Sequence, residues 1–333
     1  MTTLVIGAGL VGAQVARILI EEGERPVLFD TAPQTAALAE LFDPARAVVE
    51  VGDILRPLTL AAVLQRHKIT RIAHTAANPM LTLGAQRDPY AAIQLNIMGT
   101  VNVIEAARAF GIKRVVVSSS NVLNHFVAGG DGSGDPMRET AFPRPTTFYA
   151  STKQAIESLG LNYARWHGIE FAAMRYGAVF GPWSGAGGGG PSNIMREAVG
   201  RALRGEEAVL PAGAMEWVYS KDAGAGTVLA LKAKELGGGV FNITMGSLSS
   251  PDDMAKALKA AVPGAKVRIE TPTAAAVSLP DMKAVSDLSL AKKTLGFAPK
   301  YGLAEGVRDL VAWTKALRGE LNPVWEPTRR TEL

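Results

Sequence analysis

The chain opens on Thr2-Thr3-Leu4-Val5-Ile6-Gly7-Ala8-Gly9-Leu10-Val11-Gly12, and most of the expected architecture follows from this stretch. The apolar run before the glycines predicts a buried strand, and the segment from Leu10 to Glu22 predicts a helix. Glycines spaced GxGxxG between a strand and a helix are typical of a dinucleotide-binding turn. Gly7 permits the tight turn, Gly9 lets the backbone approach a pyrophosphate, and Gly12 lets the helix pack closely on the strand. The alternative is a glycine-rich turn that binds nothing.

The start of this helix offers free backbone N–H groups, at Leu10 and Val11, and the positive end of the helix dipole, which suit a pyrophosphate. A second predicted strand, Arg25 to Phe29, ends at Asp30. An acid at this distance past the glycines is placed to accept hydrogen bonds from an adenine ribose, with a turn or helix cap as the alternative. Residues 31–33 contain no Arg to receive a 2′-phosphate, so the sequence favours NAD over NADP.

Strands and helices go on alternating after this unit. Further strands are predicted at 47–51, 71–74, 113–117 and 170–176, and a long helix at 88–110. This alternation predicts an α/β fold with a Rossmann-type doubly wound parallel sheet, which binds ligands at the carboxyl ends of its strands. Residues at or just past those ends are therefore assigned to the cofactor: Asp53, Ile54, Thr75, Ala76 and Ala77. Asp53 could equally cap a helix.

After residue 176 the alternation breaks, and a smaller interleaved C-terminal substrate lobe is expected. The predicted division is a NAD-binding domain at 1–176 with 218–245 packing back onto it, a substrate lobe at 177–217 and 246–320, and a tail at 321–333. The glycine-rich run at 184–191 is interpreted as a lid over the site or as an ordinary surface loop.

A helix that begins after Pro143 and Pro145 carries the pair with the clearest chemistry. Thr147 is its expected N-cap, so Tyr149 and Lys153 lie one turn apart on one face. A phenol with an ordinary pKa of about 10 is a poor base at neutral pH, and a cation one turn away is expected to lower that pKa. The pair therefore suits proton transfer to or from a hydroxyl. An ordinary amphipathic helix is the alternative.

Polar residues near the ends of the fourth, fifth and sixth strands are assigned to the substrate: Asn78, Ser119, Ser120, Asn121 and Arg175. The three serines at 118–120 could bond a substrate oxygen or only form a turn. Arg175 could hold a carboxylate by a two-pronged pair, or merely pack at the strand end.

The composition excludes several other classes of protein. The chain has no cysteine and four histidines, so disulfides, thiol catalysis and Cys-based zinc sites are excluded and a metal site is not expected. The net charge of +4 comes without any basic block, so no nucleic-acid partner is expected. We find neither an apolar run of transmembrane length nor a signal peptide, so we expect a cytoplasmic protein without a membrane partner.

Taken together, the motifs resemble the extended short-chain dehydrogenase/reductase superfamily, in its NAD-dependent epimerase/dehydratase branch. The resemblance runs nearly end to end and rests on five segments: 96–107, Ser118-Ser119-Ser120, Tyr149-Ala150-Ser151-Thr152-Lys153, 175–182 and 287–313. Three departures stand out. Ile6 replaces the family's first turn glycine, Ala178 stands where Asn is usual, and Met215 replaces an Arg that grips a diphosphate in nucleotide-sugar members.

The resemblance implies the following roles. Tyr149 takes or gives the proton of a carbinol, Lys153 holds the nicotinamide ribose and tunes Tyr149, and Ser119, with Ser120 as the second choice, orients the substrate oxygen. Asn96 holds the cofactor or only shapes its helix, and Tyr176 also belongs to the cofactor site. The family often forms homodimers by pairing the helices that begin at Asp88 and Thr147 into a four-helix bundle.

These expectations describe an NAD-dependent oxidoreductase that acts on a secondary alcohol of a small polar substrate, a sugar or sugar acid near Arg175. One alternative is a nucleotide-sugar epimerase, in which a transient ketone is reduced again from the other face. The replacement of the family's Arg by Met215 and the neighbouring Glu216 disfavour a diphosphate. Another alternative is a non-catalytic NAD-sensing protein, which would have no use for Tyr149 and Lys153 together.

Overall fold

A computed structural model describes residues 1–77, 85, 87–123, 136–141, 143, 145, 147–236, 239–270, 284–317 and 319. Its centre is a parallel sheet of seven strands in the order β10-β6-β5-β4-β1-β2-β3. The strands are β1 (Thr3–Ile6), β2 (Val27–Asp30), β3 (Val48–Val51), β4 (Arg71–His74), β5 (Arg114–Ser120), β6 (Glu170–Tyr176) and β10 (Gly239–Ile243). The predicted α/β fold with a doubly wound parallel sheet is confirmed.

Helices cover both faces of this sheet, each over its own apolar core. On one face lie α3 (Pro57–His67), α6 (Gly99–Ala109) and α8 (Phe148–His167), whose side chains pack with those of the strands around Ile72 and Val115. On the other lie α1 (Leu10–Glu21) and α10 (Ser220–Lys232), which pack on each other. The central parallel strands are buried on both faces, which explains their nearly continuous apolar sequence, whereas the edge strand β3 is partly exposed.

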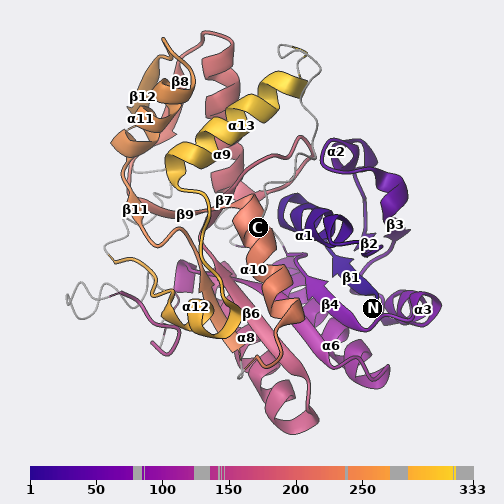
Figure 1. Ribbon diagram of the computed structural model, residues 1–333. Helices are drawn as coiled ribbons and strands as arrows, with labels where there is room; N and C mark the ends of the chain where they lie inside the picture. Colours follow the sequence, from indigo (N-terminus) through magenta and orange to yellow (C-terminus); the bar gives the residue numbers. More distant parts are fainter. Residues whose placement is uncertain are drawn as a thin grey trace.

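A smaller group of elements gathers beside the sheet, at the upper left of Figure 1. It contains the pair β8 (Ala208–Pro211) and β12 (Val267–Glu270), with α9 (Gly189–Leu203), α11 (Pro251–Ala261) and α13 (Leu303–Leu317). A three-stranded sheet connects it to the rest, made of β7 (Ala178–Phe180), β9 (Met215–Tyr219) and β11 (Leu248–Ser249). The fold also contains three short helices, α2 (Thr35–Ala39), η1 (Pro44–Arg46) and α12 (Ser289–Leu295).

The segment expected to be one long helix at 88–110 is interrupted. It consists of α5 (Pro89–Ile93), the π-helical turn η2 (Gln94–Met98) and α6. A π turn holds one more residue than an α turn, so it changes which side chains face the sheet. The turn places Asn96 in the interior, 2% exposed, where its side-chain amide donates to Thr152 Oγ1 of α8 at 3.1 Å.

Candidate active site

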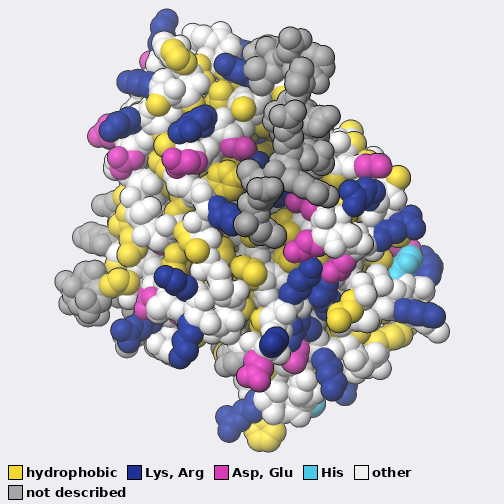
Figure 2. Space-filling view, in the orientation of Figure 1, with side chains coloured by type: hydrophobic (Ala, Val, Ile, Leu, Met, Phe, Trp, Pro, Cys, Tyr) yellow, Lys and Arg dark blue, Asp and Glu magenta, His cyan; other side chains and the backbone are white. Residues whose placement is uncertain are grey.

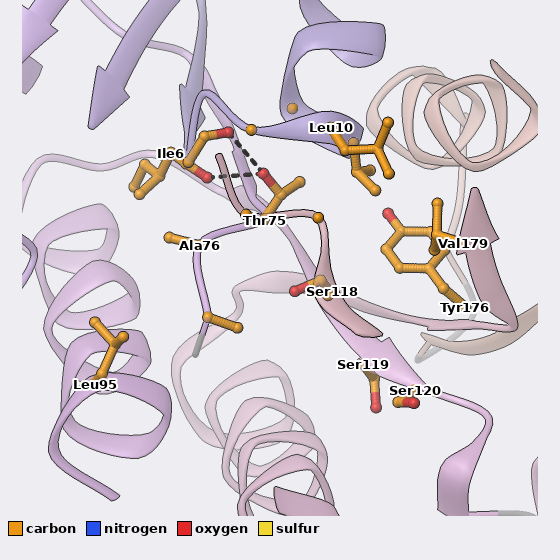
Figure 3. A pocket seen from close by; sticks show the side chains of 18 of the residues that line it. Ile6, Leu10, Thr75, Ala76, Leu95, Ser118, Ser119, Ser120, Tyr176 and Val179 are labelled. Carbon is orange, nitrogen blue, oxygen red and sulfur yellow. Dashed lines mark hydrogen bonds between the residues drawn. The ribbon is translucent and has the colours of Figure 1, made fainter. Parts of the chain in front are cut away.

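A cavity of about 730 Å³ opens along the carboxyl ends of the central strands. Its walls come from the glycine turn after β1, the ends of β2, β4 and β5, the start of α8 and the connection that leads into α9. Figure 3 shows the three serines of β5 in a row along it, with Leu95 on one side and Tyr176 and Val179 on the other. The structure thus brings together at one cavity most of the residues assigned from sequence.

The glycine turn can be built only with glycine at two positions. Gly7 has φ +92°, and a Cβ there would lie 2.6 Å from the backbone nitrogen of Ala76. A Cβ on Gly12 would lie 1.8 Å from the carbonyl oxygen of Gly7. At Gly9, by contrast, a Cβ would meet nothing within 4 Å. That open space borders the cavity, beside the first N–H groups of α1, and fits the close approach of a dinucleotide pyrophosphate.

The hydroxyl of Thr75 holds this turn against the end of β4. It donates to the carbonyl oxygens of Ile6 at 3.0 Å and Gly7 at 2.9 Å, as the dashed lines in Figure 3 show. Ala76 and Ala77 follow it along the cavity wall. Thr75 therefore fixes the shape of the floor, and the two alanines leave room above it.

Two carboxylates line the cavity near the turn. Asp30, at the end of β2, accepts the backbone N–H of Ala8 at 2.8 Å and that of Ala32 at 2.9 Å. Asp53 accepts the N–H of Leu55 at 2.8 Å in the turn before α3, and it does not cap that helix, whose N-cap is Arg56 without a side-chain bond. Ile54 lines the cavity next to it. The backbone bonds hold the Asp30 carboxylate in one place at the position expected for an adenine ribose.

Tyr149 and Lys153 lie one above the other at the start of α8, which is capped by the Thr147 hydroxyl as expected. The ammonium of Lys153 lies 5.5 Å from the centre of the Tyr149 ring and donates to the carbonyl oxygen of Ser118 at 2.7 Å. Burial lowers the pKa of Lys153 to about 8, and the charge of Glu157 opposes that shift. The pair therefore has the geometry that its spacing predicted.

The pKa of Tyr149 differs from the sequence expectation. Burial raises it to about 12, against the opposing effect of a hydrogen bond with the Ser120 side chain. In the protein alone Lys153 does not lower this pKa, since its ammonium is directed onto the backbone of β5. At neutral pH the phenol is thus protonated and able to donate.

The positions of the two candidate serines differ from the expectation. β5 continues through Ser120, so successive side chains alternate, with Ser118 and Ser120 half-buried and Ser119 buried between them. Ser119 Oγ donates to Glu157 Oε1 at 2.5 Å, whereas the Ser120 hydroxyl bonds with Tyr149. The predicted strand ended at residue 117, so nothing in the sequence indicated that the side chains of the three serines alternate between the two faces of β5. This geometry favours Ser120 over Ser119, and the assignment of either serine to a substrate oxygen stays a prediction.

The geometry also disfavours the prediction that Arg175 holds a substrate carboxylate. Its guanidinium is 3% exposed and is held by Glu157, with Nε donating to Oε1 at 2.9 Å and Nη2 to Oε2 at 2.8 Å. Breaking such a buried pair would leave an uncompensated charge, so Arg175 cannot turn to a substrate. Glu157 lies one turn beyond Lys153 on α8, so its position on the same helix face could have been predicted from this spacing.

Of the remaining assigned residues, some line the cavity and others do not. Asn96 is buried against α8 and is not among the described residues that line the cavity, so it shapes the helix and does not touch the cofactor space. Tyr176 lines the cavity, and its hydroxyl bonds with Thr227 at 2.5 Å. Asn121 lines it too, with its amide donating to Glu216 Oε2 at 3.2 Å. Asn78 lies outside the described residues.

Two residues of the cavity wall, Glu216 and Gln34, make contacts that the sequence did not predict. Glu216, 1% exposed, joins three segments, because it accepts from the side chain of Asn121, from Thr244 Oγ1 at 2.7 Å and from the backbone and hydroxyl of Ser286. Gln34 bonds with the glycine-rich connection before α9. The bond of Glu216 with Asn121 and the bonds of Gln34 with Ala186 leave no local sequence signal, because they join positions 95 and 152 residues apart.

The described residues contain neither a candidate metal site nor a candidate membrane-spanning helix. Among the described residues, no group of three or more His, Cys, Asp or Glu side chains could hold a metal ion. No helix in the described part of the chain is long and apolar enough to cross a membrane. Figure 2 shows Lys and Arg interspersed with Asp and Glu over the visible face.

Comparison with known proteins agrees with this geometry. A model of the NAD dependent epimerase/dehydratase family matches residues 3–244. A UDP-glucuronate 4-epimerase of Thermodesulfobacterium geofontis is 25% identical over 321 residues, covering 92% of this chain and 94% of that protein. The UDP-glucose 4-epimerase of Thermus thermophilus, solved with NAD, is 25% identical with a TM-score of 0.79 over 96% of this chain and 100% of that one. A partial consensus L-threonine 3-dehydrogenase is 28% identical with a TM-score of 0.76 over 94% of this chain and 99% of that one.

Proposed function

The chain belongs to the NAD-dependent epimerase/dehydratase family, and on that premise we propose that it transfers a hydride between NAD and a secondary carbinol of a sugar or sugar acid. The observation that carries this proposal is that Tyr149, Lys153 and Ser120 line the same cavity as the glycine turn. Tyr149 gives or takes the carbinol proton, and Ser120 orients the carbinol oxygen. NAD, when bound, accepts or returns the hydride at its nicotinamide ring and carries a positive charge when oxidised.

The residues around the cavity supply the rest of the cofactor site in this proposal. Gly7, Gly9 and Gly12 leave room for the pyrophosphate, Asp30 accepts from the adenine ribose, and Lys153 donates to the nicotinamide ribose. The other members of the site are Leu10, Val11, Asp53, Ile54, Thr75, Ala76, Ala77 and Tyr176. Apart from Lys153, no Lys or Arg is among the described residues that line the cavity. The cavity therefore favours a substrate of low charge.

A nucleotide-sugar epimerase is the second candidate, because the relatives described above include UDP-sugar 4-epimerases. Against it stands Met215, which lines the cavity where a cation would hold a diphosphate. Incubation of the protein with NAD and a panel of sugars, sugar acids and UDP-sugars separates the candidates. Net NADH indicates a dehydrogenase, and an epimer without NADH indicates an epimerase. Binding of NAD without either product across the panel indicates an NAD-sensing protein and overturns the proposal.

Calorimetry with UDP provides an independent test of the substrate class. We expect no binding at micromolar concentrations, because burying about two negative charges without paired cations is unfavourable. UDP-glucose and UDP-glucuronate should behave like UDP. Micromolar binding of any of the three would contradict the expected low charge of the substrate and favour the epimerase.

Replacing each of the two neighbouring serines by alanine tests which hydroxyl orients the carbinol oxygen. Ser120→Ala is expected to lower turnover by about 10²-fold, the loss typical of removing one donor to a reacting oxygen. Ser119→Ala is the matched control, because it removes a hydroxyl one residue away that faces Glu157. Its turnover should fall by less than about tenfold, since the Arg175 pair still holds Glu157. A larger loss for the Ser119 variant would restore that residue as the catalytic serine.

The protein is expected to form a homodimer through α8 and the segment at 88–110. Phe148, Leu159 and Trp166 are 44%, 37% and 70% exposed, and their spacing of eleven and seven residues places them on one face of α8. Leu159→Glu should shift the protein to monomer in sedimentation velocity, because it puts a charge in that apolar face. Leu317→Glu on α13, where Leu317 is 44% exposed, is the control and should remain dimeric. A wild-type protein that is monomeric at all concentrations would refute the expectation.

We also propose the predicted division into a NAD-binding domain and a substrate lobe. In it, β10 and α10 belong to the NAD-binding domain, because β10 is a strand of the seven-stranded sheet and α10 packs on α1. A cytoplasmic location also stays a proposal.

A further inference from the structure

The glycine-rich connection before α9 is tied to the opposite rim of the cavity by one side chain. The amide of Gln34 bonds with a single residue in both directions: its Oε1 accepts the N–H of Ala186 at 2.6 Å, and its Nε2 donates to the carbonyl of Ala186 at 3.3 Å. The two residues are 152 positions apart in the chain. We call this pair of residues, Gln34 and Ala186, the clasp.

The connection is also held from its own side. Trp183, 1% exposed, donates from its indole N–H to the same carbonyl of Ala186 at 3.1 Å. Arg196 of α9 donates to the carbonyl of Gly185 at 2.8 Å. A Cβ on Gly185 would lie 2.6 Å from the Trp183 ring and 2.8 Å from Gln34 Oε1, so the approach needs glycine there. The clasp therefore joins Gln34 to an anchored segment rather than to a loose loop.

Both members of the clasp line the cavity, and they do so at its cofactor half. Gln34 follows Asp30 by four residues, and Ala186 is followed by Gly187 and Gly188, which also line the cavity. A Cβ on Gly188 would be 3.8 Å from Leu10 Cδ2, so the connection passes close to the start of α1. The clasp thus joins two separate segments that line the space assigned to the dinucleotide.

From this arrangement we propose that the clasp retains NAD in the protein between turnovers, and that Gln34 is a retention residue of the cofactor site. The proposal rests on the function proposed above. A dinucleotide between the two joined segments leaves only after both Gln34 bonds break. A retained cofactor serves a reaction that returns the hydride to the same substrate molecule, because a net dehydrogenase must release NADH in every cycle. Retention therefore favours epimerisation over net oxidation at this site.

The test measures release of the cofactor without any substrate. The protein is loaded with NADH and mixed with a large excess of NAD, and the loss of NADH fluorescence gives the dissociation rate. Gln34→Ala should release NADH about tenfold faster than the wild type, the ratio expected when a pair of neutral hydrogen bonds is lost. Arg196→Met, which frees the anchored side of the connection, should also release faster. Gln65→Ala, an exposed change on α3 away from the cavity, is the matched control and should release at the wild-type rate.

The outcomes separate this proposal from the one on which it rests. If the wild type binds NADH and the Gln34 variant releases it within twofold of the wild-type rate, the clasp has no retaining role while the proposed function stands. If the wild type binds no NADH, both proposals fail. Faster release from the Gln34 variant, with the Gln65 control unchanged, supports retention.

Discussion

Replacing Tyr149 by Phe is expected to lower turnover by about 10²–10⁴-fold while NAD binding survives. The phenyl ring keeps its packing at the start of α8, and the change removes only the hydroxyl that bonds with Ser120. Because no other residue is assigned to transfer the carbinol proton, the loss should appear in turnover rather than in cofactor affinity. The ammonium of Lys153 stays on the carbonyl of Ser118, so the rest of the site is left in place.

Two measurements check this result: turnover with a substrate found in the panel, and NADH binding by fluorescence. Tyr163→Phe is the matched control, since Tyr163 lies on the same helix and interacts with Glu105 away from the cavity. The control should keep turnover close to that of the wild type. If Tyr149→Phe turns over as fast as the wild type, Tyr149 is not the acid or base of this enzyme.

Discrimination against NADP is expected to be the second large effect. The Asp30 carboxylate is held by the N–H groups of Ala8 and Ala32, and in the proposed cofactor site it faces the 2′-phosphate of NADP. At ~4 Å the repulsion of one charge pair is about 1 kcal/mol in water and about 4 kcal/mol at an effective dielectric of 20. These limits correspond to a preference for NAD of roughly fivefold to a thousandfold.

Parallel titrations with NAD and NADP measure the preference directly. Asp30→Asn removes the negative charge and keeps an acceptor for one backbone N–H, so it should bring the two affinities together mainly by improving the binding of NADP. Asp43→Asn is the control, because Asp43 caps η1 at Ala45 and does not line the cavity. Equal affinities of the wild type for the two cofactors would remove Asp30 from its proposed role.

Much of this fold follows from local sequence patterns. The glycine turn, the alternation up to β6 and the Thr147 cap each depend on residues within a few positions of one another, and the structure has them as expected. The resemblance to the epimerase/dehydratase family was likewise carried by short motifs and is confirmed. The spacing of apolar residues and the capping of helices depend on residues close together in the chain, so both can be predicted from one sequence.

The differences between prediction and structure concern contacts between distant parts of the chain. Arg175 carries no sequence sign that Glu157 will neutralise it, and Ser119 none that it will face that carboxylate rather than a substrate. The end of β5 was placed three residues too early, because serines are common in turns and the strand pairing with β6 that extends it is not local. The strands β8 and β12 were missed for the same reason: they pair only with each other across the substrate lobe.

The π turn at Gln94–Met98 has a consequence for insertions and deletions in this helix. Deleting one residue from a regular helix rotates everything on one side of the cut by about 100°. Here the segment already holds one residue more than an α-helical path would need, so a deletion within 94–98 can be absorbed by a return to α-helical geometry. Leu95 would then leave the cavity wall and Asn96 would lose Thr152, while α5 and α6 kept their faces. A length variant at this point would thus alter the site and spare the fold.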